Sequence, residues 1–161
     1  EVGQTLARGF LEQTGLEISA FDIRFDDPSS PPSRAQLDFP GLRFASSAAA
    51  AVDGTDLVIS AVTAAQDVVA AESVADALAP QTWFLDVNSV APGTKQAVAR
   101  LIDAASGRYV EAAIMSPIQP LGRNALYPQA RPNIATAGSM ACFISYGVIG
   151  FDYHDMQLVG N

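Results

Sequence analysis

The sequence predicts a doubly wound α/β domain, in which a mostly parallel sheet carries helices on both faces. Short apolar runs of strand length alternate with longer segments of helical periodicity along the whole chain. Several of these runs are apolar at consecutive positions, which is typical of strands covered on both faces. In such a sheet a ligand binds beyond the carboxyl ends of the strands.

Composition limits the classes of protein and partner that are compatible with the chain. Its 161 residues, 49% of them hydrophobic, suit one domain with one sizeable core. A net charge of −8 argues against nucleic acid or an anionic membrane as a partner, because like charges repel. The single cysteine cannot form an internal disulfide, and no segment approaches a membrane-spanning length or has the pattern of a leader. These features favour a cytoplasmic protein.

The elements of the first half follow from periodicity and turn residues. Val2, Leu6 and Phe10 recur every four positions and predict a helix with its C-cap at Gly15. The segment 26–41 holds four prolines and is predicted to lack regular structure. The other predicted elements are a strand at 16–22, an edge strand at 42–45, a serine-capped helix at 46–54 and a buried strand at 56–62.

The second half continues the alternation. Thr63 is predicted to cap a helix that stops at Pro80, and Pro92 to begin a helix that ends at Gly107. Beyond a proline-rich, irregular stretch that reaches Pro132, the sequence predicts a mostly apolar helix and a last strand. The predicted elements of this half are strands at 82–87, 108–114 and 151–159 and the apolar helix at 139–149.

Gly3 and Asp22 have the spacing of a dinucleotide-binding unit. In such a unit the last glycine of the G-x-G-x-x-G loop lies in the first helical turn, and an acid about 20 residues later binds the ribose hydroxyls. Alternatively, Gly3 is incidental and Asp22 merely caps a turn. A carboxylate at this place favours NAD because it repels a 2′-phosphate, whereas Arg24 could hold that phosphate, so NADP stays open.

The stretch "DVNSVAPGTK" places polar groups at the ligand edge of the predicted sheet. Asp86 ends a buried strand, Asn88 and Ser89 supply an amide and a hydroxyl, and Pro92 follows as a first-turn proline. The alternative interpretation is an ordinary serine and asparagine turn with a capping proline.

With "EVG", the acid-ended strand, "LVISAV" and "EAAIMSPIQPLG", this stretch resembles the cofactor domain of the β-hydroxyacid dehydrogenases, the 3-hydroxyisobutyrate and 6-phosphogluconate dehydrogenase-like superfamily. It is most similar to a less characterised bacterial branch with the motifs G-x-G-E-V-G and D-x-N-S-x-x-P. The resemblance covers nearly the whole chain. It implies one Rossmann-like domain over residues 1–161, NAD or NADP as the cofactor, and oxidation of a small β-hydroxy acid by hydride transfer.

The resemblance also assigns residues to the cofactor and the substrate. The residues expected to bind the cofactor, together with Arg24, are Glu1, Val2, Gly3, Asp22, Val62, Thr63 and Asn88. The residues expected at the catalytic centre, beside the nicotinamide and the substrate, are Asn88, Ser89 and Ser116. Ser116 lies where many members have Ser-Gly-Gly. Here Pro117 and Ile118 follow it, which removes part of the backbone amides that would bind a carboxylate, so the hydroxy acid stays open.

Family members take the hydroxyl proton with a lysine on a second, helical domain, through which they usually form homodimers. Lys95 is the only lysine here, and it is expected on a solvated face or beside a phosphate. A first strand before Glu1 would lie between the strands at 16–22 and 56–62. Its absence is expected to leave a gap or to bring those strands together, and to weaken dinucleotide binding.

Two other function classes are compatible with the sequence: a non-catalytic nucleotide-binding or regulatory module, and a flavodoxin-like domain that a bound flavin would identify. His154 is expected to be structural or exposed, and Cys142 to be a small buried hydrophobe. No cysteine and histidine cluster has metal spacing, so no metal is predicted.

Overall fold

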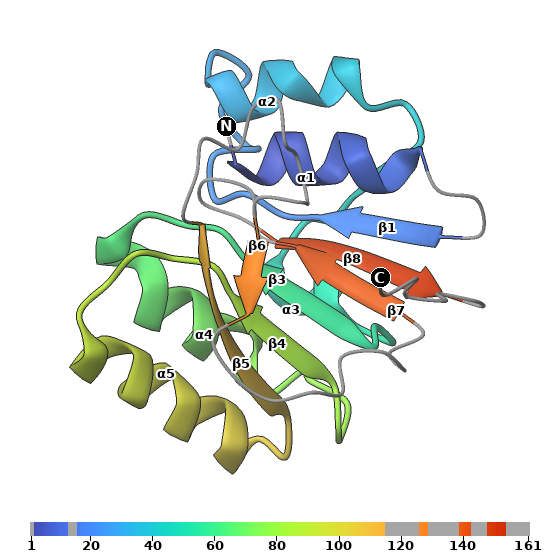
Figure 1. The fold of residues 1–161 in the computed structure, drawn as a ribbon. Helices are drawn as coiled ribbons and strands as arrows, with labels where there is room; N and C mark the ends of the chain where they lie inside the picture. The colour runs from blue at the N-terminus through green and yellow to red at the C-terminus, as the bar shows by residue number, and fades with distance from the viewer. Residues whose placement is uncertain (1, 13–15, 115–125, 129–138, 143–147, 154–161) are drawn as a thin grey trace.

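The computed structural model describes residues 2–12, 16–114, 126–128, 139–142 and 148–153 (Figure 1). Its helices are α1 (Val2–Leu11), α2 (Pro31–Ala35), α3 (Ala48–Val52), α4 (Asp67–Ala75) and α5 (Pro92–Ala104), with 3₁₀ turns η1 (Gln36–Asp38) and η2 (Ala64–Gln66). Its strands are β1 (Leu16–Ala20), β2 (Arg43–Phe44), β3 (Leu57–Ser60), β4 (Trp83–Asp86), β5 (Arg108–Ile114), β6 (Leu126–Pro128), β7 (Ser139–Cys142) and β8 (Val148–Tyr153).

The strands form one sheet in the order β2-β1-β8-β7-β3-β4-β5-β6. The pairs β2–β1, β3–β4 and β4–β5 are parallel. Strand β8 is antiparallel to both β1 and β3, so these two strands run in the same direction. The predicted α/β class with a mostly parallel sheet is therefore confirmed.

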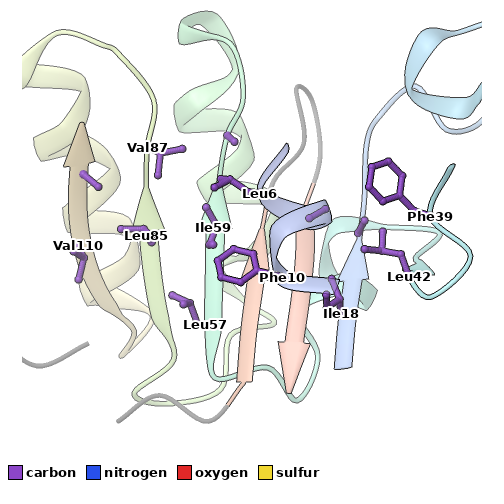
Figure 2. Close-up of a cluster of buried hydrophobic side chains, with 14 residues drawn as sticks. Leu6, Phe10, Ile18, Phe39, Leu42, Leu57, Ile59, Leu85, Val87 and Val110 are labelled. Carbon is purple, nitrogen blue, oxygen red and sulfur yellow. The ribbon is translucent and has the colours of Figure 1, made fainter. Parts of the chain in front are cut away.

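Side chains on the two faces of the sheet form two separate cores. Along β3, Leu57 and Ile59 belong to the core under α1, whereas Val58 belongs to the core under α3, α4 and α5. Figure 2 shows Leu6 and Phe10 of α1 next to Leu57 and Ile59 of β3 in the first core. This alternation explains why the strand is buried at every position and reads as a continuous apolar run.

The centre of the sheet differs from the prediction. Strands β1 and β3 are neither separated by a gap nor paired directly, because β8 and β7 lie between them (Figure 1). The predicted helix at 139–149 is wrong, because Ser139–Cys142 is a strand and β8 already begins at Val148. Unpaired backbone groups along two facing strand edges would be costly, and these two strands satisfy them. The predicted last strand at 151–159 overlaps β8 at residues 151–153, and the rest of it lies outside the described residues.

Two predicted irregular stretches contain regular structure. Pro31 and Pro32 begin α2. Proline has no backbone N–H, but in the first turn of a helix such a group would have no intrahelical acceptor, so nothing is lost. The Ser30 hydroxyl caps this helix by accepting a hydrogen bond from the Ser33 backbone N–H at 3.1 Å. Prolines therefore begin this helix rather than exclude it. The second stretch contains β6, which pairs antiparallel with β5.

The prediction for α4 is wrong at both ends. The Thr63 side chain makes no capping hydrogen bond, and η2 intervenes before the α-helix begins at Asp67. The helix ends at Ala75, well before Pro80. By contrast, Ser47 caps α3 by accepting from the Ala50 backbone N–H at 3.0 Å, as the serine before the alanine run predicts.

Gly107 lies where α5 passes into β5, and a Cβ there would be 2.8 Å from Ile102 Cγ2 and 3.2 Å from the Ile102 carbonyl oxygen. We expect Gly107→Ala to lower the free energy of unfolding by about 1–3 kcal/mol, because the added Cβ would overlap the Ile102 side chain and its backbone carbonyl. Chemical denaturation measures this change. Gly93→Ala in the first turn of α5 is the matched control, since a Cβ there meets nothing within 4 Å. A Gly107→Ala protein as stable as wild type would contradict the tight packing of this turn.

Candidate functional site

Three strands deliver their carboxyl ends to the same edge of the sheet. Ala20 of β1 and Ser60 of β3 pair with adjacent residues of β8, and Asp86 of β4 pairs with Ser60. Asp22, Val62 and Asn88 each follow two residues after one of these strand ends. The register therefore brings these three sequence-predicted residues to one edge of the sheet.

A hollow of about 310 Å³ lies at this edge, between the end of β1 and the helices α3 and α4. Phe21 and Ile23 line it from the segment after β1, Val62 from the segment after β3, and Val69 from α4. The side chains of Ile23 and Val69 are 56% and 54% exposed although they are large and apolar. Exposed apolar side chains gathered around a concave surface are typical of a ligand-binding site.

Asp22 lies next to this hollow but is itself only 1% exposed. Its Oδ1 accepts a hydrogen bond from the Arg24 backbone N–H at 2.9 Å. This bond closes a tight turn at the end of β1 and fixes the backbone of Ile23 between the two residues. The Arg24 side chain is exposed.

Asn88 connects the ends of β3 and β4 through its side chain. Its Oδ1 accepts a hydrogen bond from the Val62 backbone N–H at 2.6 Å. Its Nδ2 donates to Ser60 Oγ at 2.9 Å and to Asp67 Oδ1 at 2.7 Å. The residue is 6% exposed, so these contacts lie in the protein interior.

Asp86 is fully buried and is held by donors from α5, from β5 and from the loop after β4. Lys95 of α5 lies 2.7 Å from Asp86 Oδ1, and the Asn88 backbone N–H donates to the same oxygen at 2.9 Å. The Tyr109 hydroxyl of β5 donates to Asp86 Oδ2 at 2.9 Å. Burial, and then the Asp86 charge, raises the pKa of Tyr109, so this hydroxyl stays protonated and remains a donor at neutral pH.

Asp67, the first residue of α4, is a second fully buried acid in this network. Burial raises the pKa of Asp67 to about 6, and the neighbouring Asp86 charge acts in the same direction. The hydrogen bond from Asn88 and the charge of Lys95 act in the opposite direction and keep the shift smaller. The Asp67 Oδ2 accepts no hydrogen bond among the described residues. A protonated Asp67 could donate to Asp86, which also favours the neutral form.

The remaining predicted site residues are placed as follows. Gly3 is buried in the first turn of α1, where the dinucleotide unit requires its last glycine. Val2 is half-buried against the core under α1, whereas Thr63 and Ser89 are exposed at the strand ends. Their roles toward a ligand stay predictions. Glu1, Ser116 and His154 lie outside the described residues, and of Cys142 only the backbone is described.

The expectation for Lys95 is wrong, because its side chain is 7% exposed and paired with Asp86 rather than solvated. One signal in the sequence could have found this. Lys95 precedes Val98 and Ile102 by three and seven positions, which places all three on the core-facing side of one helix. Sequence reasoning also missed Asp67 and Tyr109, which reach the network from α4 and β5.

The fold defines the class of protein: a Rossmann-like α/β fold of the NAD(P)-binding type. A conserved hypothetical protein from Sinorhizobium meliloti matches with a TM-score of 0.67 and 32% identity over 74% of this chain and 40% of its own. The 3-hydroxyisobutyrate dehydrogenase of Mycobacterium tuberculosis, solved with L-serine, matches with a TM-score of 0.65 and 19% identity over 79% of this chain and 42% of its own. An imine reductase from Myxococcus stipitatus in complex with NADP⁺ matches with a TM-score of 0.58 and 16% identity over 71% of this chain and 38% of its own.

The predicted resemblance to 3-hydroxyisobutyrate dehydrogenase-like oxidoreductases is thus confirmed at the level of the fold, which imine reductases share. The chain spans about two fifths of the length of these solved proteins. Neither a family model nor a curated protein matches the sequence. Within the described ranges no group of three or more histidine, cysteine, aspartate or glutamate residues could hold a metal ion. No helix in these ranges has the length and hydropathy needed to cross a membrane.

Proposed function

We propose that residues 1–161 are the NAD(P)-binding domain of an oxidoreductase. The observation that carries this proposal is the hollow of about 310 Å³ at the carboxyl ends of β1 and β3. In open α/β sheets, ligands bind in the crevice outside these strand ends. The apolar lining from Phe21, Ile23 and Val69 suits an adenine ring, and the negative charge of the adjacent Asp22, buried at the end of β1, favours a ribose without a 2′-phosphate.

The residues around α1 support the same ligand. Gly3 lies buried in the first turn of α1, so the backbone at this helix N-terminus is close to the sheet. Backbone N–H groups at a helix N-terminus favour a phosphate or pyrophosphate. The residues present therefore fit two parts of a dinucleotide: a purine ring at the hollow and the central pyrophosphate at α1.

For the whole protein we propose oxidation of a small β-hydroxy acid. A bound nicotinamide would accept the hydride. Ser89 is exposed at the end of β4, where its hydroxyl can contact a substrate, and Ser116 is proposed to join it. Asn88 lies beside Ser89 in the chain, but its side chain is engaged within the protein. Two assays test the activity. With 3-hydroxyisobutyrate and oxidised cofactor, the formation of reduced nicotinamide is followed; with a cyclic imine and reduced cofactor, the consumption of reduced nicotinamide is followed.

Fluorescence titration of the purified protein with NADH and NADPH tests cofactor binding. We expect NADH to bind more tightly by about tenfold, because the Asp22 carboxylate repels a 2′-phosphate. In Asp22→Asn this preference is expected to disappear. The asparagine Oδ1 can still accept from the Arg24 N–H, so the turn itself should persist.

Asp26→Asn is the matched control, because Asp26 is an exposed carboxylate on the same loop. It should leave the preference unchanged. A folded wild-type protein that binds neither dinucleotide would refute the proposed cofactor role. Equal affinities for NADH and NADPH in the wild type would refute the assignment of Asp22 as the selecting residue.

A further inference from the structure

We infer that Asn88 and Asp67 are positioning residues that fix the Val62 backbone and the start of α4, which together form one wall of the hollow. The sequence predicts that Asn88 touches the cofactor and the reacting groups. The structure assigns it a different task, since its side chain is engaged by the protein on every polar atom. What the hollow binds rests on the proposed function, but the positioning itself does not.

The side chain of Asn88 makes three hydrogen bonds within the protein. The amide oxygen accepts from Val62, and the two amide hydrogens are donated to Ser60 and Asp67. These partners belong to the end of β3, the loop after it and the first turn of α4. One buried side chain therefore joins three segments at the ligand edge.

The orientation of this amide is fixed by its partners. The Val62 N–H can only donate, and an ionised Asp67 carboxylate can only accept. A flipped Asn88 amide would place hydrogen against hydrogen at Val62 and oxygen against oxygen at Asp67. Asp67 thus holds Asn88 in the one orientation that binds the Val62 amide.

The wall that this arrangement fixes faces the hollow. Val62 lines the hollow directly, and Gln66, Val69 and Ala70 line it from the turn and helix around Asp67. Asp67 itself lies beside Asp86, whose carboxylate is tied to β5 and α5 through Tyr109 and Lys95. The network therefore anchors the first turn of α4 to strands β3, β4 and β5.

An exchange of the two side chains tests the inference. Asn88→Asp removes both amide hydrogens and adds a third carboxylate beside Asp67 and Asp86, so we expect the Val62 amide to exchange with solvent about tenfold faster or more. We expect NADH affinity to fall by about tenfold in the same variant. Asp67→Asn alone retains an oxygen that accepts from Asn88 and should change either quantity by less than about threefold.

The double variant Asn88→Asp/Asp67→Asn restores the pairing in reverse. The carboxylate introduced at position 88 can then accept from the Val62 N–H and from the amide introduced at position 67, and the Ser60 hydroxyl can turn to donate. We expect Val62 protection and NADH affinity to return to within about threefold of wild type. Glu72→Gln, an exposed neutralisation on α4, is the control and should change neither quantity.

Amide exchange of ¹⁵N-labelled protein measures Val62 without any ligand, and NADH fluorescence measures the hollow. If Asn88→Asp keeps wild-type protection and affinity, the inference is wrong. If Asn88→Asp does not fold, the double variant decides. A double variant that folds and protects the Val62 amide supports the inference, and a double variant that does not fold overturns it. Restored protection in a protein whose wild type binds no NADH would support the positioning role and refute only the proposed cofactor.

Discussion

Replacing Lys95 with methionine is expected to lower the free energy of unfolding by about 3–5 kcal/mol at neutral pH. Lys95 lies 2.7 Å from Asp86 Oδ1, and their side chains are 7% and 0% exposed. Methionine fills a similar volume but leaves the Asp86 carboxylate buried without a cation, beside a second acid at Asp67. The two remaining donors, Tyr109 and the Asn88 backbone, offset part of this cost. Urea denaturation measures the change.

Two further variants isolate the charge effect. Arg100→Met removes an exposed cation from the same helix and should change the free energy of unfolding by less than about 0.5 kcal/mol. Lys95→Met/Asp86→Asn removes both charges of the pair and should recover more than half of the loss, because an amide is far less costly to bury than an unpaired carboxylate. If Lys95→Met were as stable as Arg100→Met, the buried ion pair would have no structural importance.

The sequence predicts the three parallel strands on one side of the sheet well. The runs at 56–62, 82–87 and 108–114 correspond to β3, β4 and β5 with small differences at their ends. The apolar residues of β3 and β4 are consecutive because both faces are covered, by α1 on one side and by α3, α4 and α5 on the other, whereas the exposed Glu111 interrupts the apolar run of β5. The information is local: strand length, turn residues and the helices between them suffice.

The centre of the sheet was not predictable in this way. The stretch around Ser139–Cys142 is apolar and alanine-containing, so its periodicity suits a buried helix as well as a strand. Its conformation depends on pairing with β8 and with β3, a strand that lies far earlier along the chain. Tertiary pairing overrides local propensity at such positions.

In the candidate site, too, some features follow from local sequence and others depend on tertiary contacts. Strand ends can be located from sequence, so the edge that Asp22, Val62 and Asn88 share follows from the order of the elements. The contacts among side chains could not be located, since Asp67, Lys95 and Tyr109 come from three different elements. Spacing along one element predicts which face a residue occupies; it does not predict which residue of another element it meets.

Asp67→Asn is expected to stabilise the protein by about 2 kcal/mol at pH 8, with a gain that vanishes toward pH 4. Burial raises the pKa of Asp67 to about 6 in the folded state, against about 3.9 in an unfolded chain. Between these values the folded state binds more protons, so the wild-type free energy of unfolding decreases as pH rises from about 4 to 6. Above that range the full penalty for the buried charge is present.

Asparagine removes this charge while an amide oxygen can still accept from Asn88 Nδ2. The full pKa difference corresponds to about 3 kcal/mol and already includes the attraction of Lys95, whereas the lost attraction of a carboxylate to the α4 N-terminus reduces the expected gain. Urea denaturation of both proteins from pH 4 to 8 measures the difference, with Asp76→Asn as the exposed control near the end of α4. A pH-independent difference, or a loss of stability that grows with pH, would contradict a raised pKa at Asp67. Because Asp67→Asn keeps the Asn88 contact, a more stable protein that still protects the Val62 amide would separate the cost of the charge from the positioning role of the side chain.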